Sequence, residues 1–405
     1  MRKIVIGGGA AGLVAAYAAA THGHEVILLE KNEKLGKKIY ITGKGRCNVT
    51  NDATCEKFLE HVVRGRKFLT GAIYRFSPAD MMKLLEEEGL ALKVERGGRV
   101  FPVSDHASDV TKTLERALKR LGVDIRLGVE VQKIQVEDGV VRGVLTSSGE
   151  IPAENVIVAT GGLSYPSTGS TGDGYRFAEE AGHTLTPRVP SLVGVEVRGV
   201  SSAQGISLKN CVLTARQGGK VLFSELGELL FTHYGISGPL TLTLSSCINR
   251  LPLSEVALFL DFKPALDEKK LEARLLRDFE DRSNEQMKNV MRGLLPAALV
   301  PLVLREAHIS LEKRANVVTR EERARLIRAL KAFPMQPTAL CGFEEAVVTS
   351  GGVELKEIDP KTMESKRVKG LYFCGEVLDV DAHTGGFNLQ IAFSTGHAAG
   401  IGKDA

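Results

Sequence analysis

A glycine-rich turn between two apolar segments near the start of the chain restricts the fold more than any other feature. Residues 3–6 (KIVI) are typical of a short buried strand, and a G-x-G-x-x-G pattern and a small-residue helix follow. A second strand, residues 25–30, ends in Glu30, whose carboxylate can accept hydrogen bonds from ribose hydroxyls. The glycines allow a tight turn, close approach of a pyrophosphate and close helix packing. We therefore predict a dinucleotide site whose first contacts are Gly7, Gly9, Ala10, Ala11 and Gly12.

Two later segments indicate which dinucleotide binds. An acid at the end of the second strand disfavours the 2′-phosphate of NADP, which leaves FAD and NAD. Residues 123–158 alternate apolar and polar positions as in a β-meander, and the apolar strand 156–162 ends in Ala-Thr-Gly-Gly. This order resembles the second nucleotide-contact motif of FAD proteins of the glutathione reductase type. Strand 371–380 carries a Gly-Glu pair, and a Gly-Gly turn then opens a small-residue helix. The resemblance implies FAD.

Five longer stretches resemble one family over nearly the whole length, the bacterial NAD(P)/FAD-dependent oxidoreductases of the YhiN, BaiN and RdsA type. They are residues 41–51, 159–175, 227–239, 348–353 and 361–396. Two positions near the expected flavin depart from many relatives, which have Trp at position 391 and Gly at 382, where this chain has Ile391 and Ala382. The resemblance and the motifs together imply further FAD contacts at Lys31, Lys38, Gly43, Arg46, Asn48, Thr160, Gly161, Gly162, Gly375, Glu376, Asp379, Gly385, Gly386, Phe387, Asn388 and Leu389. Asn388 is also a candidate cap of the last helix.

The predicted fold class is α/β, with a Rossmann-like FAD-binding domain of the glutathione reductase type interrupted by two insertions. We expect the FAD-binding domain to comprise 1–190 and 345–405. Short strands separated by glycine predict a β-barrel-like subdomain over 191–265 plus about 333–344. Helical periodicity with dense mixed charge predicts a helical subdomain over 266–332.

Charge and cysteine content set looser limits. The net charge is +4, which neither demands nor forbids a nucleic-acid partner, although residues 31–46 and 300–331 are locally basic. The six cysteines are scattered without a C-x-x-C pair, so we expect reduced thiols and no metal site. The longest apolar stretch, 293–304, is too short to span a bilayer. With no room for a leader before the first strand, we expect a cytoplasmic protein without a membrane partner.

Candidate catalytic residues come from polar positions in the family motifs. Cys47 could donate a proton to a carbon opposite a hydride donor, although a lone cysteine is more often a buried apolar residue. His233 lies in a glycine-containing turn and could contact substrate, and a structural histidine is about as common in such a place.

Three functions remain open from the sequence. The favoured one, an activity associated with this family, is reduction of uridine to dihydrouridine in 23S ribosomal RNA, for which the base must be unstacked. The alternative is a small-molecule flavin oxidase or dehydrogenase acting on amines or steroid-like ring carbons, and a non-catalytic flavin protein ranks last. No second G-x-G-x-x-G fold is present, so NAD(P)H is expected to act as a transient reductant. The sequence indicates no oligomeric state.

Overall fold

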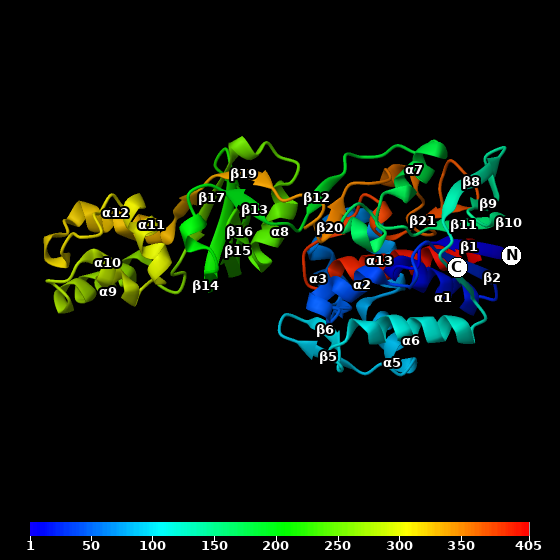
Figure 1. Cartoon of the computed structure of the whole chain (residues 1–405), viewed down its shortest axis with the longest axis horizontal. Coiled ribbons are helices and arrows are strands. Elements are labelled where there is room, and N and C mark those ends of the chain that lie inside the picture. The colour runs from blue at the N-terminus through cyan, green and yellow to red at the C-terminus, as the bar shows by residue number, and fades with distance from the viewer. Residues whose placement is uncertain (405) are drawn as a thin grey trace. The chain divides into compact units, whose positions relative to one another are not determined.

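The computed structural model describes residues 1–404 and divides into two compact units (Figure 1). Unit 1 comprises Met1–Ser191 and the chain from Phe343 onward, and unit 2 comprises Leu192–Gly342. The predicted α/β class and Rossmann-like core are confirmed by the parallel sheet of unit 1. Within the described residues, no helix has both the length and the apolar character needed to cross a bilayer.

Five parallel strands form the central sheet of unit 1. Their order is β21 (Leu371–Phe373), β11 (Asn155–Val158), β1 (Arg2–Ile6), β2 (Glu25–Glu30) and β7 (Asp124–Leu127). The three strands predicted to precede nucleotide-binding turns, β1, β11 and β21, are therefore neighbours. Since carboxyl ends of parallel strands lie at one edge, the turns that follow them lie together.

Helices α1 (Ala10–Thr21) and α13 (Phe387–Ile401) pack closely because small residues face each other. A Cβ built on Gly396 would lie 2.3 Å from the carbonyl oxygen of Ala11, and one on Gly400 would lie 2.3 Å from that of Ala15. No larger residue fits at either glycine without moving backbone.

A buried lysine joins the first strand to the last helix. Lys3 is 1% exposed, and its Nζ donates to the carbonyl oxygens of Gly400 (2.9 Å) and Ile401 (3.2 Å). These carbonyls lie at the C-terminal end of α13, where a helix lacks internal donors and carries partial negative charge. The Lys3 ammonium group supplies the missing hydrogen-bond donors, and its positive charge offsets the partial negative charge at this end of the helix.

The predicted β-meander is present with one correction. Strands β8 (Val131–Glu137), β9 (Val140–Thr146) and β10 (Gly149–Pro152) form an antiparallel sheet. Residues 124–127, which we assigned to the meander, instead form β7 at the edge of the parallel sheet, because they pair with β2. Alternation of side chains alone does not distinguish these two pairings.

The remaining elements of unit 1 surround this core. They are α2 (Lys37–Ile41), β3 (Thr50–Asn51), α3 (Cys55–Glu60), β4 (Val62–Arg64), α4 (Arg66–Arg75), α5 (Pro78–Glu87), β5 (Leu92–Glu95), β6 (Arg99–Pro102), α6 (Ala107–Arg120), α7 (Asp173–Glu180), β12 (Val189–Ser191), β20 (Val348–Ser350) and β22 (Asp381–Ala382).

Unit 2 contains a seven-stranded sheet and several helices with one continuous hydrophobic core. The strand order is β18 (Phe333–Met335), β17 (Val256–Asp261), β14 (Ser207–Gln217), β15 (Lys220–Phe231), β16 (Gly235–Ser237), β13 (Val195–Val197) and β19 (Pro337–Leu340). The helices are α8 (Pro239–Ile248), α9 (Glu268–Asp281), α10 (Met287–Val290), α11 (Val300–Glu306) and α12 (Arg320–Lys331). Leu260 of the sheet and Leu271 and Leu330 of the helices belong to the same core.

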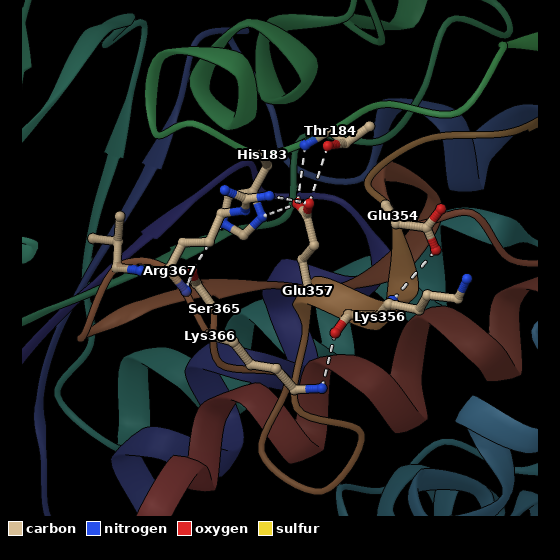
Figure 2. Close-up of polar contacts among 9 residues, drawn as sticks. His183, Thr184, Glu354, Lys356, Glu357, Ser365, Lys366 and Arg367 are labelled. Carbon is tan, nitrogen blue, oxygen red and sulfur yellow. Dashed lines mark hydrogen bonds and ion pairs between the residues drawn. The ribbon is translucent and has the colours of Figure 1, made fainter.

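A buried histidine holds the loop after α7 to the segment before β21, as Figure 2 shows. Its Nδ1 lies 3.0 Å from Oε2 of Glu357, and its Nε2 lies 2.8 Å from Oγ of Ser365. Burial lowers the pKa of this histidine, His183. Arg367, assisted by Thr184, lowers the pKa of Glu357 to about 2. Ser365 Oγ accepts from the backbone N–H groups of 367 and 368, which marks the cluster as a structural brace.

This brace predicts a loss of stability on acidification. A histidine whose native pKa is depressed stabilises the fold above its unfolded pKa of about 6.5, and that contribution is lost as the pH falls toward the native value. The Glu357 contribution has the same sign and is lost between about 4.5 and 2. We expect His183→Gln to reduce the drop in thermal midpoint between pH 7.5 and pH 5.5. The exposed control His106→Gln should keep the wild-type drop, and equal drops in both variants would contradict this assignment.

Candidate active site

Unit 1 contains a large cavity at the edge where β1, β2 and β11 end. It has about 1310 Å³ of empty space, including the part that opens to solvent. Of the predicted cofactor contacts, the structure places these in its lining: Gly7, Gly9, Ala10, Ala11, Glu30, Lys31, Lys38, Thr160, Gly161, Glu376, Asn388 and Leu389. Segments from the start of the chain, from residues 159–177 and from residues 374–392 thus meet around one cavity.

The glycines of the first turn have separate structural tasks. Gly7 has φ +103°, and a Cβ there would lie 2.6 Å from the carbonyl oxygen of Ala159. A Cβ on Gly12 would lie 1.9 Å from the carbonyl oxygen of Gly7, so α1 can approach β1 only with glycine there. Gly9 differs, since a Cβ there meets no protein atom within 4 Å. Because Gly9 lines the cavity and precedes the uncapped N-terminus of α1, its missing side chain leaves room for an anionic ligand.

Glu30 is fixed by backbone and side-chain donors at the end of β2. Its Oε2 accepts from the N–H of Gly8 (2.7 Å), and its Oε1 accepts from the backbone N–H (2.8 Å) and Nδ2 (2.7 Å) of Asn32. The carboxylate is 8% exposed and lines the cavity. Its orientation is therefore fixed, as a ribose-binding acid requires.

A second carboxylate, that of Glu376, is compensated by a lysine. Lys38 Nζ lies 2.7 Å from Glu376 Oε2 and 2.5 Å from Ser164 Oγ. Glu376 Oε1 accepts from Ser164 Oγ (2.6 Å) and from the backbone N–H of Thr349 (2.9 Å). An unpaired carboxylate here would repel a bound pyrophosphate. Because Lys38 neutralises its charge, Glu376 can offer a hydrogen-bond acceptor beside the cavity without that repulsion.

The residues of the cavity wall fit a dinucleotide such as FAD. The N-terminus of α1 has no side-chain cap, and Gly9 leaves open space beside it for an anionic group. Glu30 presents a carboxylate held in a fixed orientation.

Asn388 does not cap the last helix. Its Oδ1 accepts from the N–H of Ala382 (2.9 Å), and its Nδ2 donates to the carbonyl oxygens of Ala382 (2.8 Å) and His383 (3.2 Å). The N-cap of α13 is Gly386, without a side-chain cap, so the capping prediction is wrong. Asn388 lines the cavity while bracing the segment before the helix.

The loop 42–48 contributes less to the cavity lining than the family motif at residues 41–51 suggested. Arg46 pairs with Glu95 and with Asp105, the latter at 2.7 Å, so its charge is already compensated. The Cys47 thiol is fully buried in the hydrophobic core, and burial raises its pKa to about 12. Asn48 Oδ1 is buried without a partner in the described chain. None of the three lines the cavity.

Other predicted contacts lie behind the lining or away from it. The predicted contacts outside the cavity lining are Gly12, Gly43, Arg46, Asn48, Gly162, Gly375, Asp379, Gly385, Gly386 and Phe387. Gly375 instead packs on α1, where a Cβ would lie 2.8 Å from that of Ala11. His233 lies exposed in unit 2 with its ring edge-to-face to Tyr234 at 5.0 Å, beside a surface depression that includes Arg198.

Sequence reasoning missed several lining residues. They include Asn32, Lys37, Val129, Glu130, Val131, Thr168, Gly169, Ser170 and Asp173. Asp173 accepts from Lys31 at 2.6 Å, and Asn32 donates to the carbonyl oxygen of Thr168 at 3.2 Å. The loop after β11 therefore closes over the end of β2. The glycine and serine content of that loop was a signal, since it permits such close approach.

The open space at Gly9 predicts a ligand-specific defect. Gly9→Val should fold, because a Cβ at this position meets no protein atom within 4 Å, and it should weaken FAD binding at least tenfold, or about 1.4 kcal/mol. The measurement is fluorescence quenching of FAD titrated with the flavin-free protein. Gly293→Val in unit 2, also free of contacts, is the matched control and should bind normally. Unchanged binding by Gly9→Val would remove this turn from the site.

No group of three or more His, Cys, Asp or Glu side chains suited to a metal occurs in the described part of the chain.

Comparisons with known proteins agree with this geometry. The chain is 35% identical to the 3-dehydro-bile acid delta(4,6)-reductase of Clostridium scindens, over 98% of this chain and 97% of the relative. It is 33% identical to the ribosomal RNA dihydrouridine synthase of Haemophilus influenzae, with the same coverage. A 3-ketosteroid-delta4-(5alpha)-dehydrogenase from Rhodococcus jostii RHA1 shares the fold, with 16% identity, a TM-score of 0.54, and coverage of 98% of this chain and 95% of that one. The model for the HI0933-like protein Rossmann domain matches residues 1–402. The chain therefore belongs to the HI0933-like family and is an FAD-dependent oxidoreductase.

Proposed function

We propose that this enzyme reduces a carbon–carbon double bond conjugated to a carbonyl group. The two relatives reported above are named for a steroid and for a nucleoside, which differ in size and charge. A 3-oxo steroid with double bonds at positions 4 and 6, and uridine with its C5–C6 double bond, share one reactive unit. In each case a hydride adds to the end of a conjugated double bond that is farther from the carbonyl, and a proton adds to the other carbon of that bond; in uridine these are C6 and C5.

The cavity of unit 1 carries this proposal, since its residues suit FAD. When bound, FAD supplies the hydride at its isoalloxazine ring. The chain's own groups orient it: the N-terminus of α1 and Gly9 receive the pyrophosphate, and Glu30 receives a ribose. The Lys38–Glu376 pair supplies a neutral polar wall.

Uridine in 23S ribosomal RNA is the favoured substrate. Of the two basic segments, only the second keeps several basic side chains without ion-pair partners, and so only that segment is a candidate to bind RNA phosphates. In residues 31–46, most basic side chains already have partners, such as Lys38 with Glu376 and Arg46 with Asp105. In residues 300–331, no ion pair is found for Arg314, Arg320 or Arg328 within the described chain. RNA phosphates would therefore contact unit 2 at the second segment. NAD(P)H would act as a transient reductant.

Reduction of a steroid-like small molecule remains the second candidate function because of the 35% identity to the bile acid reductase. The salt dependence of substrate binding distinguishes an RNA substrate from a steroid substrate. An RNA fragment containing the target uridine should bind at least tenfold more weakly when salt rises from 50 to 200 mM, because released counterions drive binding. A neutral 3-oxo-Δ4 steroid should bind almost equally at both.

The direct test is turnover with both substrate classes. We expect FAD-loaded protein supplied with NADPH or NADH to add two mass units to uridine in 23S ribosomal RNA lacking the modification, measured by mass spectrometry of nucleosides. Reduction of the steroid enone without any change in RNA would favour the second candidate. Reduction of neither, with the flavin shown to be reduced, would refute the proposed function.

Whether Cys47 has a catalytic or a structural role can be tested without knowing which substrate is correct. Because its thiol is buried and outside the cavity lining, we expect Cys47→Ala to lower the free energy of unfolding by about 1 kcal/mol and to keep turnover per bound flavin. Denaturant titration and single-turnover flavin oxidation measure the two effects. A large loss of turnover with FAD still bound and stability unchanged would contradict a purely structural role for Cys47.

A further inference from the structure

A short segment before α7 forms part of the cavity wall in unit 1. Residues 166–173, which we call the strap, run from a single helical turn at Pro166–Thr168 to the first residue of α7. The strap residues in the cavity lining are Thr168, Gly169, Ser170 and Asp173. The strap therefore borders any ligand that occupies the cavity.

A lysine that directly follows β2 holds one end of the strap. The Nζ of Lys31 lies 2.6 Å from Oδ2 of Asp173, and it donates to Oγ1 of Thr171, also at 2.6 Å. The side chains of Lys31 and Asp173 are each 27% exposed. Solvent screens such a partly buried pair only in part, so the protein itself compensates most of the charge of Lys31.

The next residue, Asn32, holds the other end of the strap and reaches the ribose-binding carboxylate. Its Nδ2 donates to the carbonyl oxygen of Thr168 at 3.2 Å and to Oε1 of Glu30 at 2.7 Å. The approach is close, since a Cβ built on Gly169 would lie 2.5 Å from this Nδ2. The strap thus lies one side chain away from Glu30, at the end of the cavity suited to the adenosine half of a dinucleotide.

A second segment lines the same end of the cavity and is attached more firmly. The N–H of Val129, a lining residue, donates to the carbonyl oxygen of Glu30 at 3.1 Å. The N–H of Gly128 donates to the carbonyl oxygen of Asn32, also at 3.1 Å. Among the described residues, no backbone hydrogen bond joins the strap to residues 25–32. Partly exposed side-chain contacts break more readily than backbone pairing, so the strap is the side that can open.

We propose that the strap is a gate for the dinucleotide and that Lys31 and Asn32 are its latch. The gate opens for FAD to enter or leave, and the latch keeps it closed between these events, so that the flavin stays bound through successive turnovers. This inference requires the FAD site and no substrate. A failure of the proposed reaction with uridine and steroid therefore leaves it unaffected.

A latch differs in its kinetic effect from a direct contact between Lys31 and a phosphate of FAD, which the sequence suggested. Weakening a latch raises the open fraction of both the empty and the occupied protein. Entry and release then become faster together, and the Kd changes little. Loss of a direct contact with the ligand instead weakens binding, mainly through faster release.

The test measures FAD binding to flavin-free protein that carries both Lys31→Met and Asp173→Asn. This double variant keeps the net charge, so the long-range attraction of FAD is preserved. Stopped-flow quenching of FAD fluorescence gives the association rate constant, and equilibrium titration gives the Kd, from which the dissociation rate constant follows. We expect both rate constants to rise about fivefold, as the loss of a partly exposed ion pair allows, with the Kd within about twofold of wild type.

The matched control carries Lys119→Met and Glu115→Gln, which removes an ion pair of 2.6 Å from the surface of α6 and should leave both rate constants unchanged. Asp173→Asn alone frees Lys31. If Lys31 is part of a latch, this single variant should release FAD faster, and slower release would assign Lys31 to the phosphates and overturn the proposal. Unchanged rate constants in the double variant would also overturn it, as would weaker binding without faster association or no FAD binding by wild type.

Discussion

The close contact between α1 and α13 is the constraint on which the site depends. Gly396 and Gly400 lie where a Cβ would come within 2.3 Å of α1 carbonyl oxygens, and Gly12 lies where one would meet the turn itself. These contacts let the first and last helices of unit 1 begin at the same edge of the sheet. The helix N-termini that we propose for dinucleotide binding are consequently fixed by packing of small residues.

The carboxylates that line the cavity are paired with donors from the protein itself. The carboxylates of Glu30 and Glu376 are each satisfied by protein donors, and Lys38 compensates the second. Burying two carboxylates near a pyrophosphate would be unfavourable without those donors. The cavity lining thus contains two carboxylates already paired with protein donors, while the N-terminus of α1 has no side-chain cap.

The sequence predicted the parts of the site that depend on local backbone geometry. Gly7, Gly9 and Glu30 lie where their motif places them, because a strand, a tight turn and a helix determine their positions within a few residues. Contacts that depend on long-range pairing were not predictable. Residues 124–127 alternate like a meander strand but pair with β2, and Lys31 forms an ion pair with Asp173, which lies 142 residues later in the chain. Arg46 was predicted to contact the cofactor, but its guanidinium forms ion pairs with Glu95 and Asp105, which are distant in sequence.

We propose that three distant turns of unit 1 form one site for a dinucleotide. Calorimetric titration of flavin-free protein with FAD and then with FMN tests it most directly, since FMN has the same ring but lacks the adenosine half and the pyrophosphate link. The account predicts one FAD per chain and binding of FMN at least a hundredfold weaker, about 2.7 kcal/mol. Equal affinity for the two flavins, or no binding of FAD, would contradict it.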